Sequence, residues 1–170
     1  MPMQKRRLRA LRGDAGQSIV EFALALPILV FGLIGGADLA RAFAIQLAVQ
    51  NGARAGAEAA AIMQAPTGDI AAAKAIDEIS RTPYLRSVNA TVNVDFKQQD
   101  GVTACALVTP TVATPCFVTV RVRYTFQTIV PWPIIPNTAD FDRSTTMRAI
   151  APPNDGDTSC VRNPGTGVCN

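Results

Sequence analysis

Histidine is absent from this sequence of 170 residues, and charged residues make up only 17% of it. Enzymes use histidine most often for general acid–base catalysis, and Ser–His or Cys–His nucleophiles also need it. The four cysteines include no Cys-x-x-Cys pair, so a zinc site would require four thiolates at unusual spacings. We therefore expect a protein that is not an enzyme and that holds no metal or cofactor.

Positive charge is concentrated at the N-terminal end. Residues 1–16 carry a net charge of +4 and the whole chain carries +3, so the remainder sums to −1. A nucleic-acid-binding domain would carry its basic residues on the folded part, so we expect no nucleic-acid partner. Basic residues beside a first apolar span hold that end in the cytoplasm. Those of this leader are Lys5, Arg6, Arg7, Arg9 and Arg12.

One long apolar stretch follows the leader. The sixteen residues after Glu21 carry no charge, and residues 18–37 reach the length of about 20 residues that a helix needs to cross a bilayer. Ala-rich sequence then continues the helical pattern to about Met63. We expect one long helix, transmembrane over residues 17–37 and continuing outside the membrane over residues 38–65.

A secretory signal peptide is the alternative interpretation of this region. Its basic segment, apolar segment and small-x-small cleavage site could correspond to the leader, the apolar run and Ala40-Arg41-Ala42. The apolar run is longer than such signals usually have, and the helical pattern continues through the supposed cleavage point. On this alternative, the protein is a signal-anchored or secreted periplasmic α+β binding module without a role in pili.

A short motif opens the apolar run. Gly16 is followed by four residues, then by Glu21 and the aromatic Phe22, in the order GQSIVEF. This motif resembles the processing site of type IV prepilins, of the sort found in tight-adherence (Flp) pili.

The sequence that follows extends the resemblance. Residues 20–61 are similar to the opening segment of TadE-like pilus-assembly pseudopilins, through VEFAL followed by LP, Asp38 and Arg41 after the span, and the run QNGARAGA. The major pilins of that system usually have Tyr where this chain has Phe22, and they are much shorter. The resemblance therefore implies a minor pilin or pseudopilin rather than the major subunit.

The resemblance implies a location, partners and a mechanism. A prepilin peptidase would cut between Gly16 and Gln17, and Glu21 of a neighbouring subunit would neutralise the new amine of Gln17. The chain would cross the bacterial inner membrane once, with its N-terminus cytoplasmic and its C-terminal domain periplasmic or extracellular. Its partners would be other pilins or pseudopilins and the inner-membrane assembly platform, and it could enter the pilus itself.

Small residues recur every fourth position along the expected long helix. Such spacing lets two helices approach closely, and Gly32 with Gly36 forms a GxxxG pair inside the span. We expect this ladder to pack against other helices, including the protein's own second helix. Its glycines are Gly32, Gly36, Gly52 and Gly56.

The remainder predicts a small α+β domain over residues 66–150. A second helix is expected from Asp69 to about Arg81, with Asp69 as its cap or first-turn acid. Strict alternation of apolar and polar residues predicts strands over 88–96 and 118–126, and a weaker third strand is expected over 141–150. The fold class is therefore α+β, with an antiparallel sheet of about three strands.

Three features of this domain call for an interpretation. Three prolines exclude regular structure from residues 130–136, whose apolar side chains we expect to cover one end of the sheet.

Arg121 and Arg123 share a polar strand face, which indicates a solvated surface or, as the alternative, a site for an anionic partner. Asp140 and Asp142 could likewise share one face of a strand.

The four cysteines indicate disulfides in an extracytoplasmic domain. They allow three pairings. We favour Cys105–Cys116, which would tie the loop between the first two strands, and Cys160–Cys169, which would close a C-terminal tail over residues 151–170.

Overall fold

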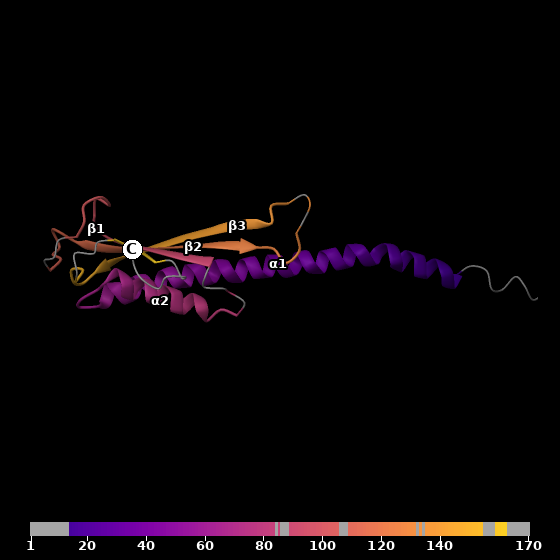
Figure 1. The fold of residues 1–170 in the computed structure, drawn as a ribbon, viewed down its shortest axis with the longest axis horizontal. Helices are drawn as coiled ribbons and strands as arrows, with labels where there is room; N and C mark the ends of the chain where they lie inside the picture. Colours follow the sequence, from indigo (N-terminus) through magenta and orange to yellow (C-terminus); the bar gives the residue numbers. More distant parts are fainter. Residues whose placement is uncertain are drawn as a thin grey trace, which may run out of the picture. The chain divides into compact units, whose positions relative to one another are not determined.

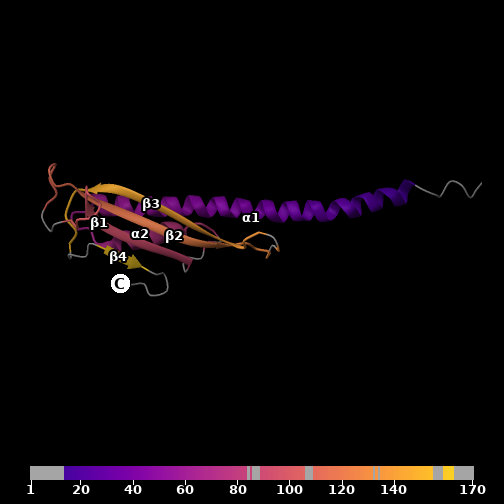
Figure 2. The ribbon, with the colours of Figure 1, turned by 90° about the horizontal axis from the view of Figure 1, so that it is seen from above.

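A computed structural model describes residues 14–83, 85, 89–105, 109–131, 133, 135–154 and 159–162. The chain divides into two compact units, one up to Leu39 and one from Ala40 onward. The first unit is the first half of a long helix. The second unit contains the rest of that helix, a second helix and a sheet (Figures 1 and 2).

The expected long helix is confirmed. Helix α1 runs from Asp14 to Ile62, with Pro27 inside it. Its stretch within Gly16–Ile62 is long and apolar enough to cross a membrane. Large apolar side chains in its first half point to all sides and are exposed, as they would be in a helix that faces lipid. The leader up to residue 13, with its basic residues, lies outside the described part of the chain.

The second helix is also confirmed, and Asp69 takes one of the two roles expected for it. Helix α2 spans Gly68–Ser80, and the hydroxyl of Thr67 caps it by accepting a hydrogen bond from the backbone N–H of Ile70 at 3.2 Å. Asp69 therefore serves as the first-turn acid rather than the cap. Its Oδ1 atom lies 3.2 Å from Nη1 of Arg162, an ion pair that joins α2 to the sheet.

The sheet has four antiparallel strands in the order β3-β2-β1-β4. The three expected strands are β1 (Ala90–Gln98), β2 (Cys116–Gln127) and β3 (Thr138–Ala149). The fourth, β4 (Ser159–Arg162), was expected to be part of an irregular tail. It pairs with β1, and Cys160 fills a buried position opposite Val94. A segment of four residues is too short for an alternating pattern to show this strand in the sequence.

One face of the sheet carries the core of the second unit. Alternate residues of β1 and β2 are buried there, as the alternation in the sequence predicts, and α2 together with the later half of α1 supplies the opposing side chains. The buried apolar residues of β1 and β2 include Val92, Val94, Phe96, Val118, Val120 and Val122, and those of the helices include Val49, Ala53, Ala57, Ala71, Ala75 and Ile79.

Two glycines set how closely α1 approaches α2. A Cβ atom on Gly56 would lie 2.7 Å from the carbonyl oxygen of Ala71, and one on Gly52 would lie 2.7 Å from Cγ1 of Ile79. No side chain fits in either place without a shift of the neighbouring atoms. The later part of the small-residue ladder thus packs against the protein's own second helix.

The structure pairs Cys105 with Cys116, as expected, and this disulfide closes the connection between β1 and β2. Cys160 is also disulfide-bonded. Its expected partner Cys169 lies outside the described residues, as does most of the C-terminal tail.

The expectation that the apolar side chains of residues 130–136 would cover one end of the sheet is wrong for Ile135, whereas Val130 is half-buried. This segment belongs to the connection between β2 and β3, and Ile135 is 62% exposed, like its neighbour Ile129 at 59%. The strands already fill their own buried face with alternating side chains, so the core has no vacant position for these isoleucines.

Candidate functional site at the start of the long helix

The residues of the expected processing site lie in the first two turns of α1. The helix begins at Asp14, so the peptide bond between Gly16 and Gln17 is part of its first turn. No atom outside the local helix lies within 4 Å of the place where a Cβ of Gly16 would be. Among the residues that the structure describes, none packs against this position, and the first turn of the helix must open for an enzyme to reach the bond.

Gln17 and Glu21 are brought together by the helical repeat. The side-chain amide of Gln17 donates a hydrogen bond to Oε1 of Glu21 at 3.1 Å, across one turn. Both side chains are exposed, and the aromatic ring of Phe22 beside them is 61% exposed. An exposed carboxylate and an exposed ring at one end of an apolar helix form a surface that a second helix can recognise.

The GxxxG pair in the span has open surroundings. Cβ atoms built on Gly32 or Gly36 would meet nothing within 4 Å, in contrast to those on Gly52 and Gly56. The ladder that looks uniform in the sequence is thus divided into two parts. At Gly52 and Gly56 the helix surface is covered by α2. At Gly32 and Gly36 it is flat and open.

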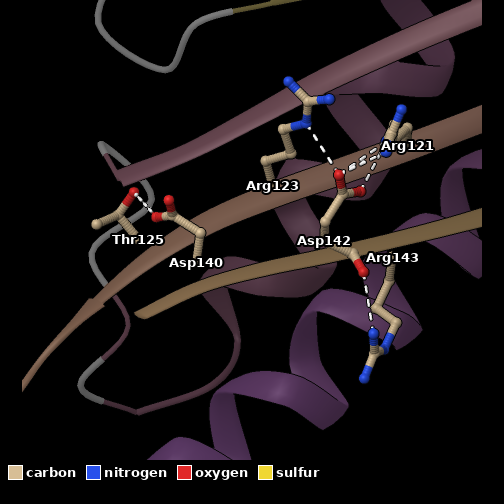
Figure 3. Close-up of polar contacts among 6 residues, drawn as sticks. All are labelled: Arg121, Arg123, Thr125, Asp140, Asp142 and Arg143. Atoms are coloured by element: carbon tan, nitrogen blue, oxygen red, sulfur yellow. Dashed lines mark hydrogen bonds and ion pairs between the residues drawn. The ribbon is translucent and has the colours of Figure 1, made fainter. Parts of the chain in front are cut away.

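The two arginines on the polar face of the sheet both form ion pairs with one carboxylate of a neighbouring strand. Both approach Asp142 of β3: Nη2 of Arg121 lies 2.7 Å from Oδ2, and Nε of Arg123 donates to the same oxygen at 3.0 Å (Figure 3). Hydrogen bonds from Arg121, and then those from Arg123, hold the pKa of Asp142 below its usual value against the opposing effect of burial. The pKa of Arg121 is raised by the same contact.

This arrangement weakens the interpretation of the arginines as an anion site. A negatively charged partner would have to compete with a carboxylate that already accepts from both guanidinium groups. Asp140 lies on the same face of β3, as the sequence indicated, and its Oδ1 accepts a hydrogen bond from the hydroxyl of Thr125 at 2.7 Å (Figure 3). Around these two arginines and two aspartates the polar face is therefore a hydrogen-bonded surface with two positive and two negative charges.

One contact in the second unit was not foreseen. The guanidinium of Arg41 lies over the ring of Phe126, 5.5 Å from its centroid. A cation at this distance from an aromatic face is attracted by the ring's quadrupole. The two residues are far apart in the sequence, so their contact could be found only from the packing of β2 against α1.

Comparison with known proteins gives one finding. The family model described as TadE-like protein matches residues 16–58. The match begins at the glycine of the expected cleavage site, and it ends four residues before the end of α1. No curated protein and no solved structure matches the chain.

Proposed function

Starting from its TadE-like segment at residues 16–58, we propose that this chain is a minor pilin or pseudopilin needed to assemble a tight-adherence type pilus. The observation that carries the proposal is the coincidence of three features at one point: the start of the family match, the Gly-x4-Glu-Phe motif and the start of a helix able to cross a membrane.

The first step of the proposed mechanism is proteolytic. A prepilin peptidase hydrolyses the peptide bond between Gly16 and Gln17, leaving a carboxylate on Gly16 and an ammonium group on Gln17. Glycine offers no side chain that would obstruct the enzyme, and the surroundings of Gly16 are open. The leader has then served its purpose, which is to keep this end of the helix in the cytoplasm.

The second step is assembly in the membrane. The ammonium group of Gln17 is a new charge at the end of an apolar helix, and a charge that is left unpaired in a medium of low dielectric constant is costly. Glu21 of a neighbouring subunit neutralises it. The pair forms only when the two helices stand at the correct height, so it penalises misaligned assembly. Phe22 and the flat surface at Gly32 and Gly36 contribute packing between the helices.

The unit from Ala40 onward is the part that projects from the membrane on the periplasmic or extracellular side. Its disulfide between Cys105 and Cys116 is of a kind that persists in oxidising compartments. In this position the domain would cap, initiate or connect the growing fibre, and it would contact other pilins and the inner-membrane platform.

A gel-mobility experiment tests the processing step. The full chain is expressed with a prepilin peptidase as wild type, as Gly16→Val and as the control Gly13→Val, which places the same side chain elsewhere in the leader. We expect wild type and the control to shorten and Gly16→Val to remain at precursor length. Equal mobility of all three proteins would remove the processing step from the proposal.

A secreted or signal-anchored binding module remains the alternative function. Its secreted form would require a cut near Ala42, whereas its signal-anchored form requires none. Against such a cut, α1 runs unbroken through residues 40–42, and Arg41 contacts Phe126 in the folded domain. These observations favour a chain that keeps this segment. In the same experiment, a mature chain that begins after Ala42 would establish the alternative.

A further inference from the structure

Phe117 stands on the side of the sheet that faces away from the core. The alternation along β2 buries Cys116 and Val118 and turns Phe117 to the opposite, polar face, where its side chain is half-buried. The other side chains that β1, β2 and β3 present on this face are polar. A single apolar side chain on a surface is ordinary, so what the ring can do depends on the groups around it.

The pairing of the strands places this ring in an open groove. Phe117 stands opposite Lys97 of β1. In the next row on the same face, Thr119 stands opposite Asp95 of β1 on one side and opposite Thr146 of β3 on the other. These side chains, together with the turn that follows β1, line a groove of about 460 Å³.

The turn after β1 forms one wall of the groove, to which it contributes Gln99 and Gly101. The backbone N–H of Gly101 donates to the carbonyl of Gln98 at 2.9 Å. Oδ1 of Asp100 accepts from the backbone N–H of Val102 at 3.0 Å. Gly101 has a φ of 70°, a conformation that glycine adopts without steric cost. Bonds within the turn therefore hold this wall in place before any ligand arrives.

The polar groups of the groove are not used up by one another. The side chains of Asp95, Lys97 and Gln99 form no hydrogen bond or ion pair with any residue that the structure describes. The hydroxyls of Thr119 and Thr146 bond to each other at 2.9 Å, and each keeps capacity for a further partner. In the neighbouring part of the same face, by contrast, both arginines are bound to one carboxylate (Figure 3).

The chemistry of the groove selects among classes of ligand. The charges of Asp95 and Lys97 cancel, so the groove offers little attraction to a phosphate or a nucleic acid. A peptide binds along a strand edge or fills apolar pockets, whereas this groove lies on a sheet face and has one large apolar side chain, Phe117. A saccharide fits both features. Its C–H groups pack on an aromatic ring, and its hydroxyls donate to carboxylates and accept from ammonium and amide groups.

We propose that this groove binds an extended, β-1,4-linked glycan chain. One sugar ring stacks on Phe117, and its neighbours bond to Asp95, Lys97 and Gln99 through their hydroxyls. The groove is open rather than enclosed, so it fits a segment of a chain better than a single sugar. A β-1,4-linked chain is flat and presents C–H groups on its faces, which suits a ring on a sheet surface. The inference goes beyond the proposed role in assembly, because it gives the domain a polysaccharide contact of its own.

Calorimetric titration of the full chain tests this inference. The chain is purified in a detergent whose headgroup contains no sugar, and the probes are tetrasaccharides of β-1,4-linked glucose and of β-1,4-linked N-acetylglucosamine. We expect at least one probe to bind, and the difference between them shows whether the acetamido group contributes. Phe117→Ala should weaken binding about tenfold or more, because it removes the stacked ring. Its control, Phe43→Ala, removes a ring that is 59% exposed on α1 and should bind as wild type does.

A second variant separates binding from folding. Asp95→Ala/Gln99→Ala removes two side chains that form no bond within the described part of the chain, so its thermal unfolding should match that of wild type while its binding is weakened. If neither tetrasaccharide binds to wild type, the inference is wrong. Binding that is unchanged in both groove variants, or that is lost equally in Phe43→Ala, also contradicts it. These results leave the processing step untouched, so the proposed function stands or falls by its own experiment.

Discussion

Glu21 combines two interactions that single substitutions can separate. In the folded chain it accepts a hydrogen bond from Gln17, and in the proposed assembly its charge neutralises the amine of a neighbouring chain. We expect Glu21→Ala and Glu21→Gln to be inserted and cut as in wild type but to abolish pili. Glutamine keeps an acceptor for the amide of Gln17 and removes the charge, so its failure would assign the effect to the charge.

Counting pili by electron microscopy in complemented cells measures this effect. Glu58→Ala is the matched control, because Glu58 is an exposed glutamate on the same helix, outside the span. It should leave pili intact. Normal pili in the Glu21→Gln cells would show that the carboxylate matters only for the local hydrogen bond.

Asp142 gives a prediction about pH. Its pKa is lowered in the folded state, mainly by the hydrogen bonds from Arg121, so its ionised form stabilises the fold above the pKa of about 3.9 of an unfolded aspartate. This stabilisation is lost as the pH falls through the lower, folded-state pKa. In urea unfolding of the full chain in detergent, wild type should therefore lose more stability than Asp142→Asn between pH 5 and pH 2.

The difference should be small and should shrink in high salt, because the ion pairs are partly exposed and are screened by solvent. An identical loss of stability in both proteins would show that the arginines do not favour the charged carboxylate.

The single residues differ in how far the sequence could predict them. Gly16, Gln17 and Glu21 stand in a local motif, so spacing alone singled them out. Arg121 and Arg123 were correctly placed on a polar face, but their partner Asp142 is about twenty positions away. Its identity depends on the register between β2 and β3, in which Arg123 stands opposite Asp142, and no local pattern fixes that register.

At the scale of the elements, the approach of α1 to α2 depends on a glycine. A Cβ on Gly56 would meet a backbone oxygen at 2.7 Å and the Cβ of Ala75 at 3.1 Å, so α2 would have to move. We expect Gly56→Ala to lower the free energy of unfolding of the domain by about 1–3 kcal/mol. This strain outweighs the gain of about 0.5–1 kcal/mol that alanine brings to a helix interior. Urea unfolding of the full chain in detergent, followed by circular dichroism, measures it.

Gly36→Ala is the matched control on the same helix, since its Cβ would meet nothing within 4 Å. It should leave the unfolding of the domain unchanged. Equal destabilisation by both substitutions would mean that glycine acts in this helix through chain flexibility and that close packing against α2 is unimportant.

The elements were predictable where a periodic pattern was long. Alternation in β1 and β2 and the apolar run of α1 extend over nine or more residues, so helix and strand were identified from them. The strand β4 was missed because it has four residues, and its place depends on Cys160 packing beside Gly68. Ile135 in the segment 130–136 was misjudged because apolar character was taken to mean burial, although apolar atoms also make up much of the exposed surface of a folded protein.

At the scale of the whole molecule, the two units differ in how the side chains of α1 are covered. The large apolar side chains of α1 up to Leu39 are exposed, apart from the half-buried Ile34, whereas from Ile45 onward one side of the helix belongs to the core of the α+β unit. In the proposed function, the first half of the helix lies in lipid and the second half packs against protein. The sequence predicted that change from the end of the uncharged run, but the contact of Arg41 with Phe126 emerged only from the packing of β2 on α1.

The account depends most on a cut that creates a new N-terminus within α1. Intact-mass and N-terminal peptide analysis of the chain purified from the membranes of piliated cells measures that terminus directly. We predict a chain that begins at Gln17 and retains all residues of α1 from there onward. A chain that still carries its leader, or one that begins after Ala42, would contradict the proposed processing and with it the pairing of Gln17 and Glu21 between subunits.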